Sequence, residues 1–435
     1  DVYLGYHFGN KLYVEDTTHV DMNGAGNFSG QDQLKQGLYL VFLPNKKYFD
    51  ILVPEDQHFY IKNDTVNFLD HYAIEGSQQN KLFFDYQKFL MNNQQEAQKL
   101  RQKKKELQKD DGNQETINEI DQELKQIDKK VKQRREELIK QNPQTFLASF
   151  LKATREIEVP DPPRDEQGNI TDSSFQYLYY KNHFFDHIDF SDERILRTPF
   201  FEQKLKRYIT FLPQQPDSLI PALDNVIQKA QQNDEVFQFT LSYLFNHYLK
   251  SKIMGMDKVY VHLAEKYYLA GKTPWADQKF LNKLRDRIEK IKPNLIGNQA
   301  PDLKLLTDEQ QYINLHEINA KITVLVFWEP DCGHCKKVIP KLWDLYEQYA
   351  NEGLEVLAVY TQQKQEEWKE FIKEHELQWI NAWDPNHMSN FRKLYDVYST
   401  PTIYLLDENK KILAKRIAQE DVKRFLEHEL NKAQK

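Results

Sequence analysis

Two cysteines, Cys332 and Cys335, are the residues in this chain best suited to chemistry, and they are separated by only two positions. The apolar run at 324–328 precedes them and is rich in β-branched side chains, which is typical of a buried strand. After them, apolar side chains recur at steps of three and four over 338–349, which predicts a helix. The predicted order is therefore strand, short turn, Cys-X-X-Cys and helix.

This placement favours thiol chemistry. Free N–H groups and the positive end of the dipole stabilise an anion at the start of a helix. A cysteine there loses its proton more easily, and the thiolate is the nucleophile. We therefore predict that Cys332 is the attacking residue. Cys335 lies one turn further on, where it can attack a mixed disulfide on Cys332 and release the partner.

Two other uses of the cysteine pair are less favoured. A structural disulfide between residues this close would close too small a loop to stabilise much. A closed zinc site needs four ligands, and only His334 lies nearby in the sequence. A catalytic redox pair is the favoured interpretation, with no bound metal and no cofactor.

The residues around the cysteines resemble the thioredoxin superfamily. The resemblance rests on Phe327-Trp328, then three residues, then Cys332-Gly333-His334-Cys335-Lys336, with Pro340 on the same helix. It continues at Ser399-Thr400-Pro401, just before the apolar strand at 402–406. The resemblance implies that Pro401 is a cis-proline opposite the cysteines. It also implies that Thr400 offers backbone groups to a substrate peptide and that Trp328 contributes to substrate binding.

Other features place the chain within that superfamily. The stretch Gly297-Asn298-Gln299-Ala300-Pro301 is similar to the opening of the TlpA/ResA-like branch and of peroxiredoxins. His334 between the cysteines resembles the protein disulfide isomerase motif. Its imidazolium should stabilise the Cys332 thiolate and make the disulfide more oxidising than a Gly-Pro version.

The chain also departs from the family pattern at two acidic positions. The buried acid of thioredoxin, six residues before the first cysteine, is Val326 here. The glutamate of the cytochrome-maturation members, three residues after the second cysteine, is Val338. Glu329 and Glu366 are both open as substitutes.

Size and composition limit the possible functions. A chain of 435 residues should hold two to four domains. A net charge of −7 and a pI near 6.1 argue against a general nucleic-acid or anionic-membrane surface. The start at Asp1 instead of Met suggests that a targeting segment is missing. Sparse, paired cysteines suit an oxidising compartment, so we expect the periplasm or cell envelope, with a lipoprotein anchor as one possibility.

The chain is predicted to be multi-domain, with four parts. A small antiparallel β-domain is expected over 1–76, and a helical hairpin with a coiled-coil seam over 77–142. An α-helical domain is expected over 143–292, and an α/β thioredoxin-like fold over 293–435. Within these parts, the sequence predicts a helix start at 191–194 and a helix over 386–395. This layout resembles multi-domain thioredoxin-like envelope proteins of Gram-negative bacteria.

The predicted hairpin has apolar positions in the three-four alternation of a coiled coil. They are Ile117, Ile120, Leu124, Ile127, Val131 and Leu138. The turn between the arms is placed at 110–113, and self-association through 77–142 is a possibility. Further on, His183 and His187 fall at i and i+4, on one face of a helix. A metalloprotease motif requires a Glu directly after the first histidine, and this chain has none there. Ordinary histidines are therefore favoured over a metal half-site.

Three hypotheses follow for the function. The preferred one is a thiol-disulfide oxidoreductase, a reductase or isomerase, acting on disulfide-containing proteins and supplied by an upstream thiol reductant. The alternative is a binding or scaffolding protein in which the redox pair is a sensor or anchor. A peroxidase is the third hypothesis, and the stretch Gly297-Asn298-Gln299-Ala300-Pro301 suggests it. It is the least favoured, because peroxidases of this type keep Thr three residues before the attacking Cys, where this chain has Glu329.

Overall fold

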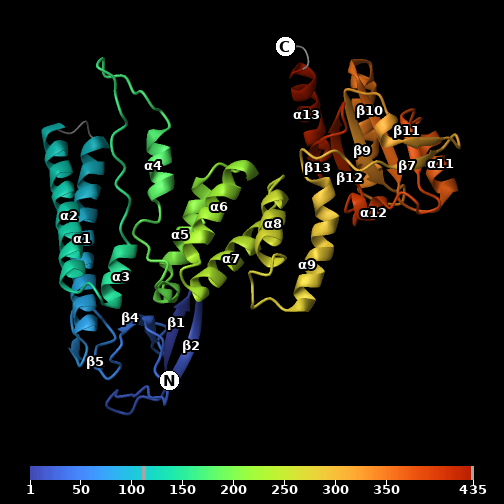
Figure 1. Ribbon diagram of the computed structural model, residues 1–435. Coiled ribbons are helices and arrows are strands. Elements are labelled where there is room, and N and C mark those ends of the chain that lie inside the picture. The colour runs from blue at the N-terminus through green and yellow to red at the C-terminus, as the bar shows by residue number, and fades with distance from the viewer. Residues whose placement is uncertain (110–113, 433–435) are drawn as a thin grey trace. The chain divides into compact units, whose positions relative to one another are not determined.

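The computed structural model describes residues 1–109 and 114–432, which are grouped in two compact units (Figure 1). The first unit comprises residues 1–214 and 224–240, and the second comprises 215–223 and the chain from 241 onward. Two helices, α6 (Pro216–Ala230) and α7 (Asp234–Leu249), contribute residues to both units. The multi-domain arrangement is confirmed, while the four domain boundaries stay predictions.

An antiparallel sheet begins the first unit, as the alternating sequence predicted. Its strands are β1 (Val2–Phe8), β2 (Lys11–Thr18), β3 (Gly37–Phe42) and β4 (Tyr48–Val53), in the order β2-β1-β3-β4. A separate two-stranded sheet joins β5 (Tyr60–Lys62) to β6 (Ala73–Glu75). The central strand β3 is buried over Gly37–Leu40 because it has a neighbour on each side and a core beneath it.

Two long helices follow, α1 (Gln78–Lys109) and α2 (Gln114–Gln141), and they contact each other. Four of the predicted seam residues on α2 are buried, at 117, 120, 127 and 138. Lys104 and Asp121 form an ion pair between the two helices, with Nζ 2.7 Å from Oδ2. The predicted turn at 110–113 lies outside the described residues, and the coiled coil itself stays a prediction.

Shorter helices complete the first unit. They are α3 (Phe146–Ala153), α4 (Phe175–His183), the 3-10 turn η1 (Glu193–Arg197) and α5 (Phe200–Phe211). The predicted helix start at 191–194 is a 3-10 turn, in which the Asp192 carboxylate accepts the Arg194 N–H.

The second unit begins with helical structure that packs on its sheet domain. Its elements are α8 (Asp257–Leu263), the π-helical turn η2 (Ala264–Tyr268), α9 (Gln278–Ile291) and the 3-10 turn η3 (Lys292–Asn294). The buried Lys415 ammonium pairs with Asp257, and Arg287 on α9 donates to Asp396 at 2.6 Å. These two ion pairs join α8 and α9 to the sheet domain.

A seven-stranded mixed sheet forms the core of the second unit, in the order β13-β12-β9-β10-β11-β7-β8. Its strands are β7 (Lys304–Thr307), β8 (Tyr312–Asn314), β9 (Ile322–Trp328), β10 (Leu354–Tyr360), β11 (Ile380–Trp383), β12 (Thr402–Asp407) and β13 (Ile412–Lys415). Strand β9 lies inside the sheet between β12 and β10 and is buried along its whole length, which explains its unbroken apolar sequence.

Apolar clusters cover both faces of this sheet. Residues of α10 (Cys335–Tyr349), α11 (Gln365–Glu374) and α13 (Gln419–Lys432) pack on one face. The other face is covered by α12 (Phe391–Leu394) and by the segment around the 3-10 turn η4 (Leu315–Glu317). A further 3-10 turn, η5 (Ala350–Glu352), precedes β10. Among the described residues, no helix combines the length and apolarity that crossing a bilayer requires.

One predicted helix of this domain is wrong in extent. The sequence predicted a helix over 386–395, but α12 covers only Phe391–Leu394. His387 and Asn390 both have φ of 52°, in the left-handed region, which interrupts a right-handed helix. The Asp384 carboxylate accepts the N–H groups of Met388 and Ser389, so this segment is a loop.

Candidate active site

The pairing of β9 with β12 brings the two predicted halves of the site together. Phe327 pairs with Thr402 in an antiparallel register. The chain before β12 therefore runs back beside the chain that follows β9, which places Thr400 opposite Glu329. The Thr400–Pro401 peptide bond is cis. The cysteine turn, which follows β9, therefore lies beside the predicted substrate-binding loop, which precedes β12.

Both sulfur atoms lie where the turn enters α10. The Cys335 N–H, at the first residue of the helix, donates to the Cys332 Sγ at 3.3 Å. The Cys332 thiol in turn donates to the Thr400 carbonyl oxygen at 3.4 Å. Cys332 is partly exposed, whereas Cys335 is fully buried, and both are free thiols. The structure thus brings Cys332, Cys335 and Thr400 together, with Pro401 next to Thr400.

The pKa values of the two thiols are shifted in opposite directions. Burial alone would raise the pKa of Cys332, but hydrogen bonds from Cys335, Thr400 and the His334 backbone bring it below its ordinary value. Burial raises the pKa of the Cys335 thiol to about 12, and its hydrogen bond to Cys332 adds to that effect. The exposed sulfur is therefore the more easily ionised, and the buried one holds its proton.

His334 occupies the N-cap position of α10 and is exposed. Its backbone N–H is one of the groups that lower the pKa of Cys332. The contribution predicted for its imidazole stays a prediction.

The structure corrects the prediction that Trp328 contacts substrate. Its side chain is fully buried at the end of β9, and its ring packs against that of Phe371 with centroids 5.0 Å apart. It belongs to the same apolar cluster as Cys335. Trp328 therefore belongs to the core that supports the site, because the last residue of a strand buried on both faces has no exposed side.

The two open candidates for a substitute carboxylate, Glu329 and Glu366, have different environments. Glu329 is half-buried beside the thiols: its Oε1 accepts from the Thr400 hydroxyl at 2.7 Å, and its Oε2 accepts from the Gln362 amide at 2.7 Å. Glu366 is exposed on α11. No local sequence pattern marks this contact, because it depends on the β9–β12 register, which pairs Phe327 with Thr402 and so aligns Glu329 with Thr400.

The histidine pair in the first unit does not share a helix face. Helix α4 ends at His183, so His187 lies beyond it, and the His183 ring stacks on Tyr179 with centroids 4.2 Å apart. The prediction of one shared helical face is therefore wrong. Within residues 1–109 and 114–432, no cluster of His, Cys, Asp and Glu is arranged to hold a metal ion.

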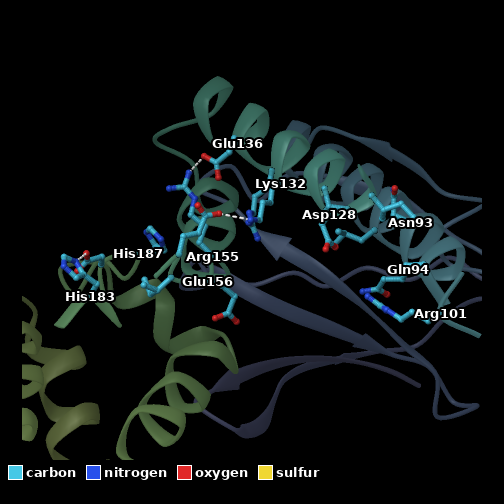
Figure 2. A pocket seen from close by; sticks show the side chains of 18 of the residues that line it. Asn93, Gln94, Arg101, Asp128, Lys132, Glu136, Arg155, Glu156, His183 and His187 are labelled. Atoms are coloured by element: carbon cyan, nitrogen blue, oxygen red, sulfur yellow. Dashed lines mark hydrogen bonds and ion pairs between the residues drawn. The ribbon is translucent and has the colours of Figure 1, made fainter. Parts of the chain in front are cut away.

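A cavity of about 780 Å³ lies within the first unit, between the α1–α2 pair, the segment at 155–158 and α4 (Figure 2). Several of its charged side chains are paired with one another. Arg155 pairs with Glu136, and Lys132 Nζ lies 2.7 Å from Glu158. Part of the charge that lines the cavity is therefore already engaged in ion pairs.

Comparisons with known proteins match both units. The AhpC/TSA family matches residues 296–415. A domain of unknown function, DUF5106, matches residues 114–294. The second match spans the hairpin's α2 and most of the helical elements, and its description names no activity.

Named relatives match the C-terminal part of the chain. The thiol-disulfide oxidoreductase ResA of Bacillus thuringiensis is 31% identical over 137 residues, which are 32% of this chain and 78% of the relative. ResA of Geobacillus thermodenitrificans is 30% identical over 30% of this chain and 76% of the relative.

Two solved structures are also similar. A domain of a possible thiol-disulfide isomerase from Cytophaga hutchinsonii is 38% identical, with a TM-score of 0.31, and covers 32% of this chain and 97% of its own. A thioredoxin-like protein from Bacteroides caccae is 21% identical, with a TM-score of 0.48, and covers 63% of this chain and 99% of its own. Through its C-terminal AhpC/TSA domain, which is thioredoxin-like, this chain belongs to the thiol-disulfide oxidoreductases related to ResA.

Proposed function

We propose that this chain reduces or rearranges disulfides of protein substrates in the cell envelope, with Cys332 as the attacking thiol and Cys335 as the resolving thiol. The single observation that carries the proposal is the contrast between the two sulfurs. Cys332 is partly exposed and has a lowered pKa, whereas Cys335 is buried and has a raised one. This is the division of labour that a two-step exchange requires.

The reaction begins with the Cys332 thiolate attacking one sulfur of a substrate disulfide. A new S–S bond joins Cys332 to the substrate, and the other substrate sulfur leaves as a thiolate. Cys335 then attacks the Cys332 sulfur, the bond to the substrate breaks, and the second substrate thiolate leaves. The substrate disulfide has gained two electrons, and Cys332–Cys335 has become a disulfide. An upstream thiol reductant returns the pair to the dithiol.

Thr400 and Pro401 are proposed to hold the substrate peptide. The Thr400 carbonyl oxygen already lies 3.4 Å from the Cys332 Sγ, so a peptide aligned along this loop brings its sulfur next to Cys332. His334 is proposed to favour the thiolate further through its imidazole, which adds positive charge beside the sulfur when it is protonated. The envelope location is supported by the use of just two cysteines, both in one redox motif.

A trapping experiment tests this proposal. In Cys335→Ala the second step has no nucleophile, so mixed disulfides with substrate proteins should accumulate on Cys332 and be released by dithiothreitol. The matched control is Cys332→Ala/Cys335→Ala, which should trap nothing. Wild-type protein should reduce insulin. Absence of any trapped species together with an inactive wild type would reject the proposal.

A binding or scaffolding role is the second candidate, and the cavity of about 780 Å³ in the first unit is the observation that favours it. Residues 77–142 would then mediate self-association. The cysteine double variant separates the two functions: a strain that keeps its full phenotype with Cys332→Ala/Cys335→Ala uses the chain for binding. Loss of the phenotype supports the redox function instead.

A further inference from the structure

Ring closure by Cys335 needs a proton acceptor, because this thiol is buried and neutral. With a pKa of about 12, about 10⁵ molecules are protonated for each ionised one at neutral pH. Part of that shift comes from the neighbouring Cys332, but burial is the largest cause and persists while Cys332 is linked to a substrate. Val326 and Val338 stand at the two positions where family members carry an acid.

One hydroxyl connects the buried sulfur to a carboxylate. The Thr400 side chain lies close enough to the Cys335 thiol to lower the pKa of that thiol, and its Oγ1 donates to Glu329 Oε1 at 2.7 Å. Because Thr400 donates its own proton to Glu329, the remaining lone pairs of its oxygen can accept a proton from sulfur. The path from Cys335 to Glu329 therefore passes through one hydroxyl group.

The environment of Glu329 suits a proton acceptor. Its two carboxylate oxygens accept from neutral groups, the Thr400 hydroxyl and the Gln362 amide, each at 2.7 Å. The carboxylate is half-buried, so it can pass a proton on to solvent after the reaction. Thr400 lies opposite it through the β9–β12 register, which fixes their separation.

We infer that Glu329 accepts the proton of Cys335 through the Thr400 hydroxyl during ring closure, an inference that rests on the function proposed above. As Cys335 attacks the Cys332 sulfur, its proton moves to Thr400 Oγ1, and the hydroxyl proton of Thr400 moves to Glu329 Oε1. The Cys332–Cys335 bond forms, the bond from Cys332 to the substrate breaks, and the substrate sulfur leaves with the electron pair. Glu329 then loses the proton to the departing thiolate or to water.

Thr400 touches the reacting sulfur, whereas Glu329 acts through it as a positioning residue. The apolar cluster that contains Cys335 also contains the titratable residues Cys332, Tyr346, Tyr349 and Tyr360. The Tyr360 hydroxyl accepts the Lys364 N–H at 3.0 Å and donates to the Lys364 carbonyl oxygen, and burial raises its pKa. Asp331 and His334 flank the site on its exposed side.

A two-phase experiment on the full chain measures ring closure separately. The reduced protein is mixed with dithiobis(nitrobenzoate), whose thiolate is coloured. The first phase of colour reports attack by Cys332, and the second reports ring closure by Cys335. In Glu329→Gln we expect the first phase to be unchanged and the second to slow by about 10²-fold at neutral pH, as for loss of a positioned base. The deficit should shrink as the pH rises toward the pKa of Cys335.

Three further variants complete the test. Thr400→Val should slow the second phase like Glu329→Gln, and Thr400→Ser, which keeps the hydroxyl, should restore it. Glu366→Gln, the exposed carboxylate on α11, should behave as wild type. The inference is overturned if Glu329→Gln closes the ring at the wild-type rate, or if its deficit is the same at every pH, which a purely structural role predicts. A wild type without the first phase would instead reject the proposed function itself.

Discussion

The proposed redox site and the cavity of the first unit differ in how their polar groups are used. The cavity encloses about 780 Å³, yet Arg155, Glu136, Lys132 and Glu158 are paired across it. At the proposed redox site, by contrast, Cys332 is partly exposed and its pKa is lowered. The proposed chemistry is therefore placed where an accessible group has a perturbed pKa, and not where the cavity lies.

Removing the Cys332 sulfur should have the largest effect and tests the contrast between the two sites most strongly. In Cys332→Ser, the rate of insulin disulfide reduction should fall to the uncatalysed rate, because a hydroxyl at this position does not ionise at neutral pH. Arg155→Met, in the cavity, should leave the rate unchanged. Equal losses in the two variants would mean that the cavity takes part in the reaction.

The next largest effect is expected on stability, from a substitution of Trp328 in the apolar cluster that also contains Cys335. Trp328→Ala deletes a fully buried ring against Phe371, so we expect about 3–5 kcal/mol less stability of the second unit. Urea unfolding followed by circular dichroism measures it. Trp328→Phe, which keeps an aromatic ring, should lose less. A variant as stable as wild type would contradict the placement of Trp328 in the core.

The pH dependence of alkylation should distinguish the two thiols. The lowered pKa of Cys332 means that its thiolate persists to a lower pH than that of an ordinary cysteine, so iodoacetamide should react with it faster there than with a cysteine in an unfolded peptide. As the pH falls through the pKa of Cys332, the rate should drop. Cys335 should stay unmodified at neutral pH because its pKa is about 12. Peptide mass spectrometry gives both rates, and equal labelling of the two residues would contradict their assigned acidities.

The smallest effect is expected at the ion pairs of the cavity. Arg155→Met breaks the pair with Glu136, and such partly exposed pairs contribute no more than about 1 kcal/mol. Urea unfolding again provides the measurement, with Glu136→Gln as the matched partner. A loss as large as that of Trp328→Ala would show that the cavity has the more important structural role.

Local sequence patterns predicted the elements of the redox domain well. The apolar run of β9, the Cys-X-X-Cys start of α10 and the Thr-Pro before β12 each have a strong signal within a few residues. The length of α12 was not predictable in the same way, because the left-handed residues His387 and Asn390 interrupt a pattern that otherwise reads as a helix.

Contacts between distant residues were the harder part of the site. Glu329 was one of two open candidates, and the choice depended on the register that aligns it with Thr400, 71 residues away. Trp328 was assigned to the substrate because of its place beside the motif, although a strand covered on both faces buries it. Burial and register are set by tertiary packing, so a single sequence indicates them only indirectly.

The most direct test of the account is a redox titration of the full chain in glutathione buffers, with free thiols counted by alkylation and mass spectrometry. We predict that both thiols disappear together and reversibly as one Cys332–Cys335 disulfide. A midpoint near about −270 mV would indicate a reductase, and one near about −180 mV an isomerase. Two thiols that stay free throughout, or that form mixed disulfides without closing the ring, would contradict it.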